Sequence, residues 1–251
     1  MPRLDVLESY YASYYDGHER DITFSAPLRF ARHLIRGLPS VSFGEAVRVL
    51  DYGGGNGSLA KAVASRLIAL GRARSADVRV VDFTPRGPSE GDGLRVEYQA
   101  PDVPIEGEYD LVLASAILEH IPSLRPVLQT LHSAIAPGGF FYARTPYVLP
   151  LTRFFPRLDL AYPAHVHDMG SEFWNRFRET FAWDVRVIVS GPSVIAGSLA
   201  DPVRTLAAAM LKAPAHLENW LSPRSRVRRT WNLVGGWEVL LQKRGPAEPG
   251  L

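Results

Sequence analysis

The sequence predicts an α/β fold with a mostly parallel β-sheet, and three observations support this prediction. Short apolar runs of strand length alternate along the chain with segments of helical periodicity. A glycine-rich loop, Gly53 to Gly57, stands between one such run and a helical segment. The chain has 251 residues, 46% of them hydrophobic and 22% charged, which is enough to bury a core without covalent cross-links. Strands that alternate with helices are joined by crossovers, and crossovers make neighbouring strands parallel.

Each element follows from its local pattern. Pro27 suits the first turn of a helix, Gly71 fits the end of the helix after the glycine loop, and Pro137-Gly138-Gly139 closes a later helix. The predicted helices are 4–16, 27–38, 58–70, 123–136 and 171–181, with a further helical stretch inside 195–231. The predicted strands are 47–51, 78–82, 94–98, 109–114, 140–144, 183–190 and 237–242.

Composition excludes several classes of function. The chain has no cysteine, so it has no disulfide framework, no thiolate metal site and no cysteine nucleophile. A formal charge of +2 is too balanced to favour nucleic acid as the main partner. Acidic residues near the amino terminus and the lack of any run of about 18 apolar residues predict a cytoplasmic protein without a transmembrane segment. No pattern in the chain decides an oligomeric state.

The strongest candidate site is the glycine-rich loop with the acids beside it. Asp51 ends the strand before the loop, and Asp82 ends the next strand. Glycines let the backbone approach a ligand closely. An acid at the end of the second strand, where Asp82 stands, can accept hydrogen bonds from ribose hydroxyls. Residues 55–60 also fit the dinucleotide pattern G-x-G-x-x-G/A. At this stage the loop therefore predicts an adenosine cofactor without deciding which one.

Three motifs together resemble the class I S-adenosylmethionine-dependent methyltransferases, particularly the broad small-molecule group. They are the acid followed by alternate glycines at 51–57, the stretch YDLVLASAILEHI at 109–121, and the turn PGGF at 137–140. The resemblance implies a Rossmann-like three-layer sandwich whose seven-stranded, mostly parallel sheet has an antiparallel last strand. It also implies an N-terminal helical cap at 1–40 and a methyltransferase domain at 41–245 with inserts at 146–170 and 195–231.

The resemblance assigns cofactor contacts position by position. Gly53 and Gly55 would pass under the methionine part of S-adenosylmethionine, and Asp82 would hold its ribose. Gln99 stands where the family often has an acid that contacts the adenine amine, which is a departure from the pattern. The full set of implied cofactor-binding residues is Asp51, Gly53, Gly55, Asp82, Phe83, Gln99, Ala100, Ala114 and Ser115.

Histidines are the candidates for accepting the proton that the methyl acceptor loses, because imidazole titrates near neutral pH. His120 follows the fourth predicted strand, and His165 lies in the segment AHVHD before a helix. The alternative for either is a packing role. His165 and His167 could form a cation site together with Glu119 and His120. A metal is not expected, however, because a related group of RNA methyltransferases uses an E-x-x-E-H pattern, and Ala116 stands here in place of its first acid.

The function predicted from these features is methyl transfer from S-adenosylmethionine to a small molecule, with oxygen favoured over nitrogen or carbon. Two alternatives stay open: an NAD(P)-dependent oxidoreductase, and a binding protein that keeps the cofactor fold without catalysis. Aromatic residues in the two inserts and in 1–40 could line an acceptor pocket, or simply pack the inserts onto the sheet. Four arginines within 224–229 could meet a phosphate, a carboxylate or an anionic membrane, or form a solvated face.

Overall fold

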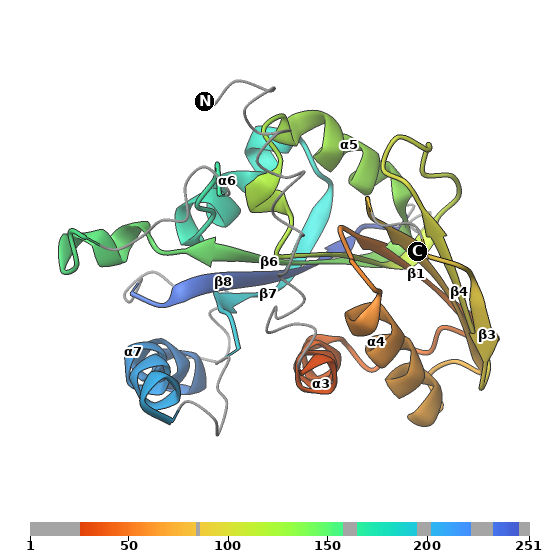
Figure 1. Cartoon of the computed structure of the whole chain (residues 1–251), viewed down its shortest axis with the longest axis horizontal. Helices are drawn as coiled ribbons and strands as arrows, with labels where there is room; N and C mark the ends of the chain where they lie inside the picture. Colours follow the sequence, from red (N-terminus) through yellow and green to blue (C-terminus); the bar gives the residue numbers. More distant parts are fainter. Residues whose placement is uncertain (1–25, 84–85, 158–164, 195–201, 222–232, 246–251) are drawn as a thin grey trace, which may run out of the picture.

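The computed structural model describes residues 26–83, 86–157, 165–194, 202–221 and 233–245. Within these ranges the chain forms one sheet of eight strands with helices on both faces (Figure 1). The helices are α3 (Pro27–Gly37), α4 (Ser58–Ala69), η1 (Leu118–His120), α5 (Leu124–Ala134), η2 (Leu149–Arg153), α6 (Ser171–Phe181) and α7 (Pro202–Leu221). The strands are β1 (Ala46–Tyr52), β2 (Ser75–Val81), β3 (Ser89–Gly91), β4 (Leu94–Gln99), β5 (Tyr109–Ser115), β6 (Ile135–Tyr147), β7 (Val185–Pro192) and β8 (Gly235–Lys243).

The strand order is β3-β4-β2-β1-β5-β6-β8-β7. The five strands from β4 to β6 are parallel to one another, whereas β8 is antiparallel to both β6 and β7. The predicted α/β class and the antiparallel last strand are therefore confirmed. Because parallel strands end at the same edge, the residues that follow β1, β2, β4 and β5 meet along one side of the sheet.

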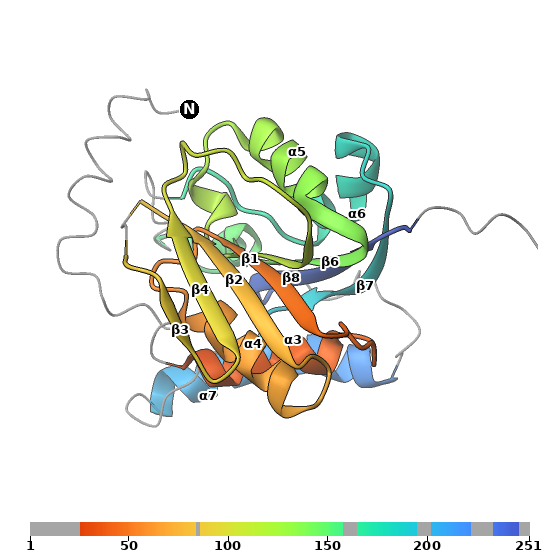
Figure 2. The ribbon, with the colours of Figure 1, turned by 90° about the vertical axis from the view of Figure 1, so that its right-hand side faces the viewer.

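Two layers of helices cover the sheet. α3, α4 and α7 lie on one face, and α5 and α6 on the other, as both views show (Figures 1 and 2). Alternate residues of the central strands pack against the two helical layers. Leu111 and Leu113 belong to the core beneath α3 and α4, while Val112 and Ala114 belong to the core beneath α5. This alternation is the two-residue period of a strand that is buried on both sides.

The prediction of seven strands was wrong by one, because β3 was missed. β3 pairs antiparallel with β4 through a tight hairpin. The turn residues Asp92 and Gly93 have φ of +52° and +74°. Positive φ at both central positions is the geometry that Asp-Gly favours in two-residue hairpins. The Asp-Gly pair was therefore a readable signal, and the shortness and polarity of Ser89–Gly91 hid it.

Several predicted boundaries also moved. The helix predicted to end at 136 ends at Ala134, and β6 then begins at Ile135 and contains Pro137-Gly138-Gly139. The pairing of β5 with β6 shifts register at this point, between Tyr109 and Leu111. A Cβ on Gly139 would lie 2.9 Å from the carbonyl oxygen of Ala136. The three residues are therefore an irregularity within the strand rather than a turn before it.

A buried polar cluster joins helices and strands on the α3 side of the sheet. The imidazole of His33 forms an ion pair with Glu238 of β8, and the hydroxyl of Tyr142 donates to the same carboxylate over 3.0 Å. Burial alone would lower the pKa of His33, but its hydrogen bond to Glu238 and the charge of Glu238 raise the pKa above its ordinary value. The cluster ties α3 to the sheet, because a buried carboxylate is stable only with such partners.

The predicted tyrosine-rich helix at 4–16 and the basic run within 224–229 lie outside the described residues. The helix at 27–38 is present as α3, and its Phe30 and Leu34 belong to the same core as β1 and α4. The division into a cap at 1–40 and a domain at 41–245 stays a prediction. Among the helices of the described ranges, none combines the length and the apolarity that crossing a bilayer requires.

Candidate cofactor and methyl-transfer site

The glycine-rich loop joins the central strand β1 to the start of α4. Asp51 lies between Val80 of β2 and Leu113 of β5 in the parallel pairing. Gly57 is the residue at the amino-terminal cap of α4, whose first N–H groups have no partner within the helix. The loop therefore lies at the carboxyl edge of the sheet, beside a helix start that favours negative or polar ligand groups.

The glycines of the loop are required by its backbone and by close packing. Gly53, Gly55 and Gly57 have φ of +68°, +56° and +68°, a region that side chains disfavour. A Cβ on Gly53 would lie 2.2 Å from Cγ1 of Ile117, and one on Gly57 would lie 2.8 Å from Cγ2 of Val80. The backbone therefore comes so close to its surroundings that a side chain would displace them.

Asp82 closes the loop from the neighbouring strand. The N–H of Gly55 donates to Oδ2 of Asp82 over 2.7 Å, and the N–H of Asp82 donates to the carbonyl of Gln99 over 3.1 Å. The structure thus brings together three predicted residues from the ends of β1, β2 and β4. Asp82 is buried, so its carboxylate has a fixed place at the edge of the loop.

Asp51 is the most perturbed acid of the site. Its side chain is 2% exposed, and its Oδ2 has no hydrogen-bond partner in the described part of the chain. Burial raises its pKa to about 7, with a further contribution from the charge of Asp82, and the backbone N–H of Ala60 opposes the rise. A buried carboxyl that titrates near neutral pH and keeps one oxygen unused is suited to a cationic ligand group.

The remaining predicted adenine contacts lie beside Asp82. Phe83 is 75% exposed and follows Asp82 directly. The side-chain amide of Gln99 donates to the carbonyl of Val103 over 3.2 Å, and the carbonyl of Ala100 accepts from the N–H of Val103. Gln99 thus holds its own loop, whereas the Phe83 ring is free to cover a flat ligand.

The end of β5 turns sharply toward the glycine loop. Ala114 is fully buried, and the hydroxyl of Ser115 is buried without a hydrogen-bond partner among the described residues. Ala116 has φ of +59°, which is strained for a residue with a Cβ. This turn carries Ile117 against Gly53 and so places η1 directly over the loop.

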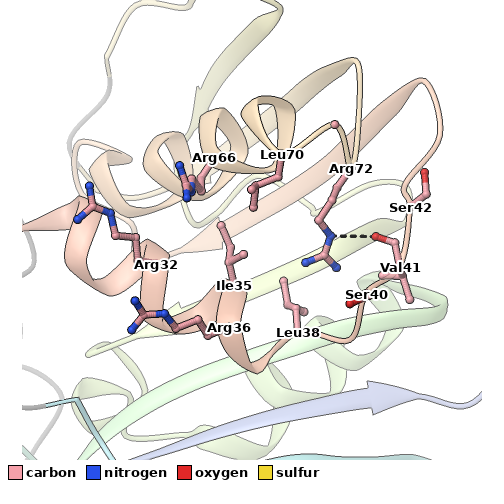
Figure 3. A pocket seen from close by; sticks show the side chains of 11 residues that line it. Arg32, Ile35, Arg36, Leu38, Ser40, Val41, Ser42, Arg66, Leu70 and Arg72 are labelled. Carbon is pink, nitrogen blue, oxygen red and sulfur yellow. Dashed lines mark hydrogen bonds between the residues drawn. The ribbon is translucent and has the colours of Figure 1, made fainter.

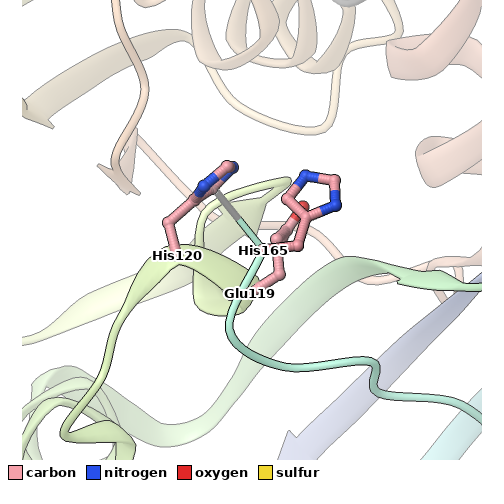
Figure 4. A group of neighbouring side chains, drawn as sticks. All are labelled: Glu119, His120 and His165. Carbon is pink, nitrogen blue, oxygen red and sulfur yellow. The ribbon is translucent and has the colours of Figure 1, made fainter. Parts of the chain in front are cut away.

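His120 and His165 lie against each other, with ring centroids 4.9 Å apart (Figure 4). One ligand atom each from Glu119, His120 and His165 lies within 4.8 Å of the others. The structure therefore brings the two predicted histidines together with the buried Glu119, which the sequence analysis considered only as a possible metal ligand. A carboxylate and two imidazoles can move a proton or hold a divalent cation.

Backbone hydrogen bonds fix the two segments that carry these histidines. The carbonyl of Glu119 accepts the N–H groups of Val166 and His167, over 2.8 and 3.2 Å. Nε2–H of His167 donates to the carbonyl of Ile121 over 2.9 Å. His167 is thus held by η1, while His165 meets His120.

Asp168 is a further residue that the sequence analysis missed. Its two carboxylate oxygens accept the N–H groups of Val148 and Leu149, over 2.8 and 2.9 Å. Burial raises its pKa, and these two hydrogen bonds and the charge of His165 act against the rise. Asp168 therefore joins the histidine segment to the residues after β6. Its place directly after H-V-H was the available signal, but no periodic pattern marks such a contact.

A comparison with known families agrees with this geometry. The family described as "Methyltransferase domain" matches residues 20–183. The chain belongs to this family. The match covers most of the chain and includes the glycine loop, both acids and both histidines. The predicted class, the class I S-adenosylmethionine-dependent methyltransferases, is therefore confirmed.

Curated relatives of this methyltransferase match it over part of their length. A ubiquinone biosynthesis O-methyltransferase of Bordetella avium is 28% identical over 143 residues, which are 52% of this chain and 55% of the relative. The chain thus spans about half the length of the curated relatives that it matches.

Solved structures show the same fold at low identity. The plantazolicin methyltransferase BpumL, crystallised with S-adenosylhomocysteine and a pentazolic desmethylPZN analogue, has a TM-score of 0.52 and 15% identity over 95% of each chain. The [4+2]-cyclase SpnF has a TM-score of 0.53 and 11% identity over 92% of this chain and 86% of its own. Since one of these proteins is a methyltransferase and the other a cyclase, the fold by itself does not define the reaction.

Proposed function

We propose that this methyltransferase transfers the methyl group of S-adenosylmethionine to a hydroxyl group of a small molecule in the cytoplasm. The observation that carries the proposal is the arrangement around Gly55. The glycine loop has no room for side chains and lies between two acids. Asp51 is buried and has one oxygen without a hydrogen-bond partner among the described residues, and Asp82 lies at the end of the next strand. The curated relatives named as O-methyltransferases support oxygen as the accepting atom.

The residues fit S-adenosylmethionine in three ways. Asp51 offers its unused oxygen to the amino group of the methionine part, and the backbone at Gly53 and Gly55 leaves room beside it. Asp82 offers its carboxylate to the ribose hydroxyls. Phe83 offers an exposed ring to the adenine. When bound, the cofactor supplies an electrophilic methyl group on a positively charged sulfur.

The protein would contribute positioning and removal of a proton. Ala114 and Ser115 lie at the end of β5, shortly before η1, and would border the reacting methyl group. The imidazoles of His120 and His165 would accept the proton of the attacking hydroxyl, since an oxygen nucleophile reacts faster as it loses its proton. In this proposal Asp168 and the carbonyl of Glu119 are positioning groups that hold the histidine segment.

Asp51 predicts a pH dependence of cofactor binding. We expect the affinity for S-adenosylhomocysteine to rise about tenfold from about pH 6 to about pH 8, because a carboxyl with a pKa of about 7 ionises over that interval and then attracts the amino group. Isothermal titration calorimetry measures the change. Asp51→Asn is the matched variant, and it should bind weakly at every pH. A wild-type affinity that is constant over this interval would contradict the role of Asp51.

The same shift has the opposite effect on the stability of the ligand-free protein. The folded carboxyl keeps its proton up to about pH 7, whereas the unfolded one loses it near 3.8, so the folded state binds more protons between these values. The free energy of unfolding of the wild type, relative to Asp51→Asn, should therefore fall by up to about 4 kcal/mol as the pH rises through this window. Urea denaturation of both proteins at several pH values tests the sign.

We propose that proton acceptance at His120 and His165 needs no metal, because Ala116 stands where the E-x-x-E-H pattern has its first acid. Turnover should therefore be the same before and after dialysis against EDTA. The cluster Glu119, His120 and His165 supplies the competing outcome. If EDTA abolishes turnover and one divalent cation restores it, the cluster is a metal site that binds the acceptor oxygen.

Two experiments test the proposed function as a whole. Calorimetry with S-adenosylhomocysteine and, separately, with NADH should give binding only with the first, and the reverse result would favour an oxidoreductase. Transfer of a radioactive methyl group over a panel of phenols, alcohols, amines and carbon nucleophiles should label hydroxyl compounds most strongly. Labelling of amines or carbon nucleophiles alone would reject oxygen as the accepting atom, and tight cofactor binding without transfer to any compound of the panel would instead favour the binding-protein alternative.

A further inference from the structure

The outer face of α7 carries a continuous stripe of large apolar side chains. Val203, Met210 and Trp220 are 79%, 68% and 76% exposed. The apolar residues are spaced by three, four or seven positions, which places their side chains on one side of the helix. The exposed residues of this stripe, called here the α7 stripe, are Val203, Leu206, Met210, Leu217, Trp220 and Leu221. So many exposed large apolar residues on one helix indicate a surface that binds an apolar partner, such as a protein or a membrane.

The opposite side of α7 is fixed to the protein, so the stripe cannot turn inward. Lys212 is buried, and its ammonium group donates to the carbonyl and the hydroxyl of Ser193, each over 2.8 Å, at the end of β7. Ala215 is fully buried on the same side. Rotation of the helix would break these hydrogen bonds and leave a buried cation without partners.

The helices of the same layer are strongly basic. α3, α4 and α7 together contain one acid, Glu218, whereas the chain as a whole has 28 basic and 26 acidic residues. α3 presents Arg29, Arg32 and Arg36 along its exposed side, and like charges at this spacing repel one another. Repulsion among these exposed arginines favours the binding of an anionic partner.

A cavity between α3 and α4 gathers some of these charges. Its volume is about 830 Å³, and Arg32, Arg36, Arg66 and Arg72 line it together with apolar side chains (Figure 3). None of the described residues that line the cavity is an acid. Arg72 holds the adjacent loop through the carbonyl of Val41, whereas Arg32 of α3 and Arg66 of α4 lie at the same end of the cavity. Guanidinium groups arranged in this way suit phosphate oxygens.

We propose that the layer formed by α3, α4 and α7 docks on a membrane that contains anionic lipids. The α7 stripe inserts among the acyl chains near the headgroups, and the arginines of α3 and α4 contact lipid phosphates. Both views place the three helices on the same face of the sheet, so they can reach one surface together (Figures 1 and 2). An apolar stripe beside basic side chains is the pattern of a helix that lies in the membrane interface.

This inference does not depend on methyl transfer. The α7 stripe and the arginine-lined cavity involve none of the residues that the proposed function uses. If the wild-type protein binds S-adenosylhomocysteine but not vesicles, the membrane surface alone is rejected. If it binds vesicles but not S-adenosylhomocysteine, the proposed function alone is rejected.

Vesicle binding by the full chain is the test. We expect sedimentation with vesicles of phosphatidylcholine and phosphatidylglycerol in equal parts, and much weaker sedimentation with phosphatidylcholine alone. Trp220 reports insertion directly, because Trp174, Trp183 and Trp237 are buried. In a Trp231→Phe background, the exposed tryptophan emission should shift to shorter wavelength on binding, and lipids brominated on their acyl chains should quench it.

Two pairs of variants separate the charged and apolar contributions. Arg32→Gln with Arg66→Gln should weaken binding to anionic vesicles about 30-fold, since each basic residue near the surface contributes a factor of about five. Arg176→Gln with Arg178→Gln, on α6 of the other layer, removes equal charge and should change binding about threefold at most.

Leu206→Ser with Met210→Ser should weaken binding about 100-fold, because two apolar side chains no longer enter the membrane. Val103→Ser is its control, an exposed apolar residue outside the α7 stripe. Both serine variants should keep the melting temperature of the wild type, since the replaced side chains are exposed.

Four outcomes would overturn the proposal, three from binding and assembly and one from competition. The first is equal sedimentation with neutral and anionic vesicles, and the second is equal binding of the Arg32/Arg66 and Arg176/Arg178 variants. The third is a dimer in analytical ultracentrifugation that Leu206→Ser with Met210→Ser dissociates, which would show that a second copy covers the α7 stripe. Competition by free inorganic phosphate, without any shift of Trp220 emission, would assign the cavity to a soluble phosphate compound instead.

Discussion

Replacing Gly53 with alanine should weaken the binding of S-adenosylhomocysteine at least 100-fold. The added Cβ would lie 2.2 Å from Ile117 at a backbone φ of +68°, so either the loop or η1 must move. Strain at such a position costs on the order of 1–3 kcal/mol, and the steric overlap adds to it, which together correspond to a factor of 100 or more. Isothermal titration calorimetry measures the loss.

Gly71→Ala is the matched control. Gly71 has nearly the same φ, +66°, but a Cβ there would meet nothing within 4 Å, and the residue lies at the other end of α4. This variant should lose some stability and keep its cofactor affinity. A second variant, Gly53→Ala with Ile117→Ala, removes the overlap and should recover part of the binding. Unchanged affinity in Gly53→Ala would mean that the cofactor does not bind beside this loop.

The second large effect is expected at His165. His165→Ala should lower kcat about 100- to 1,000-fold with the acceptor that gives the highest turnover in the methyl-transfer panel, because proton acceptance contributes factors of this size. The affinity for S-adenosylhomocysteine should stay within about twofold of the wild type, since in the proposed site the imidazole meets the acceptor rather than the cofactor. Steady-state kinetics and calorimetry measure the two quantities separately.

His167→Ala tests the local packing. His167 lies on the same segment but is held by the carbonyl of Ile121, so its loss should affect stability more than kcat. His120→Ala combined with His165→Ala should be little worse than the more damaging single variant if the two imidazoles act as a unit. A pH–rate profile adds a readout that packing alone would not move, because His165→Ala should lose the acidic limb. Wild-type turnover in His165→Ala would remove this residue from the mechanism.

Much of the cofactor site was predictable because its signals are local. Asp51 and Asp82 each follow a short apolar run, and the parallel sheet then brings the two strand ends together. The contact from Gly55 to Asp82 follows from that arrangement. The β3 hairpin was missed although Asp92-Gly93 marks it, since a strand of three exposed residues carries no hydrophobic pattern.

The proton-accepting cluster was predictable only in part. His120 and His165 were both singled out, but their contact depends on the backbone bonds from Val166 and His167 to Glu119. Such bonds leave no trace in hydrophobic periodicity, because any residue except proline can donate a backbone N–H. Asp168 was therefore recognised as a member of the site only in three dimensions, and Glu119 was considered beforehand only as a possible metal ligand.

The sequence by itself determined the alternation of strands and helices, the glycine loop and the acids at the strand ends, because these depend on spacing along the chain. The tertiary structure decided which groups became chemically unusual. Burial moves the pKa of Asp51 to about 7, and the turn at Ala116 presses Ile117 onto Gly53. It also decided that the apolar side of α7 faces outward, since Lys212 binds Ser193 on the other side. Desolvation, close contact and exposure are properties of the packed molecule, and residues distant in the sequence create them.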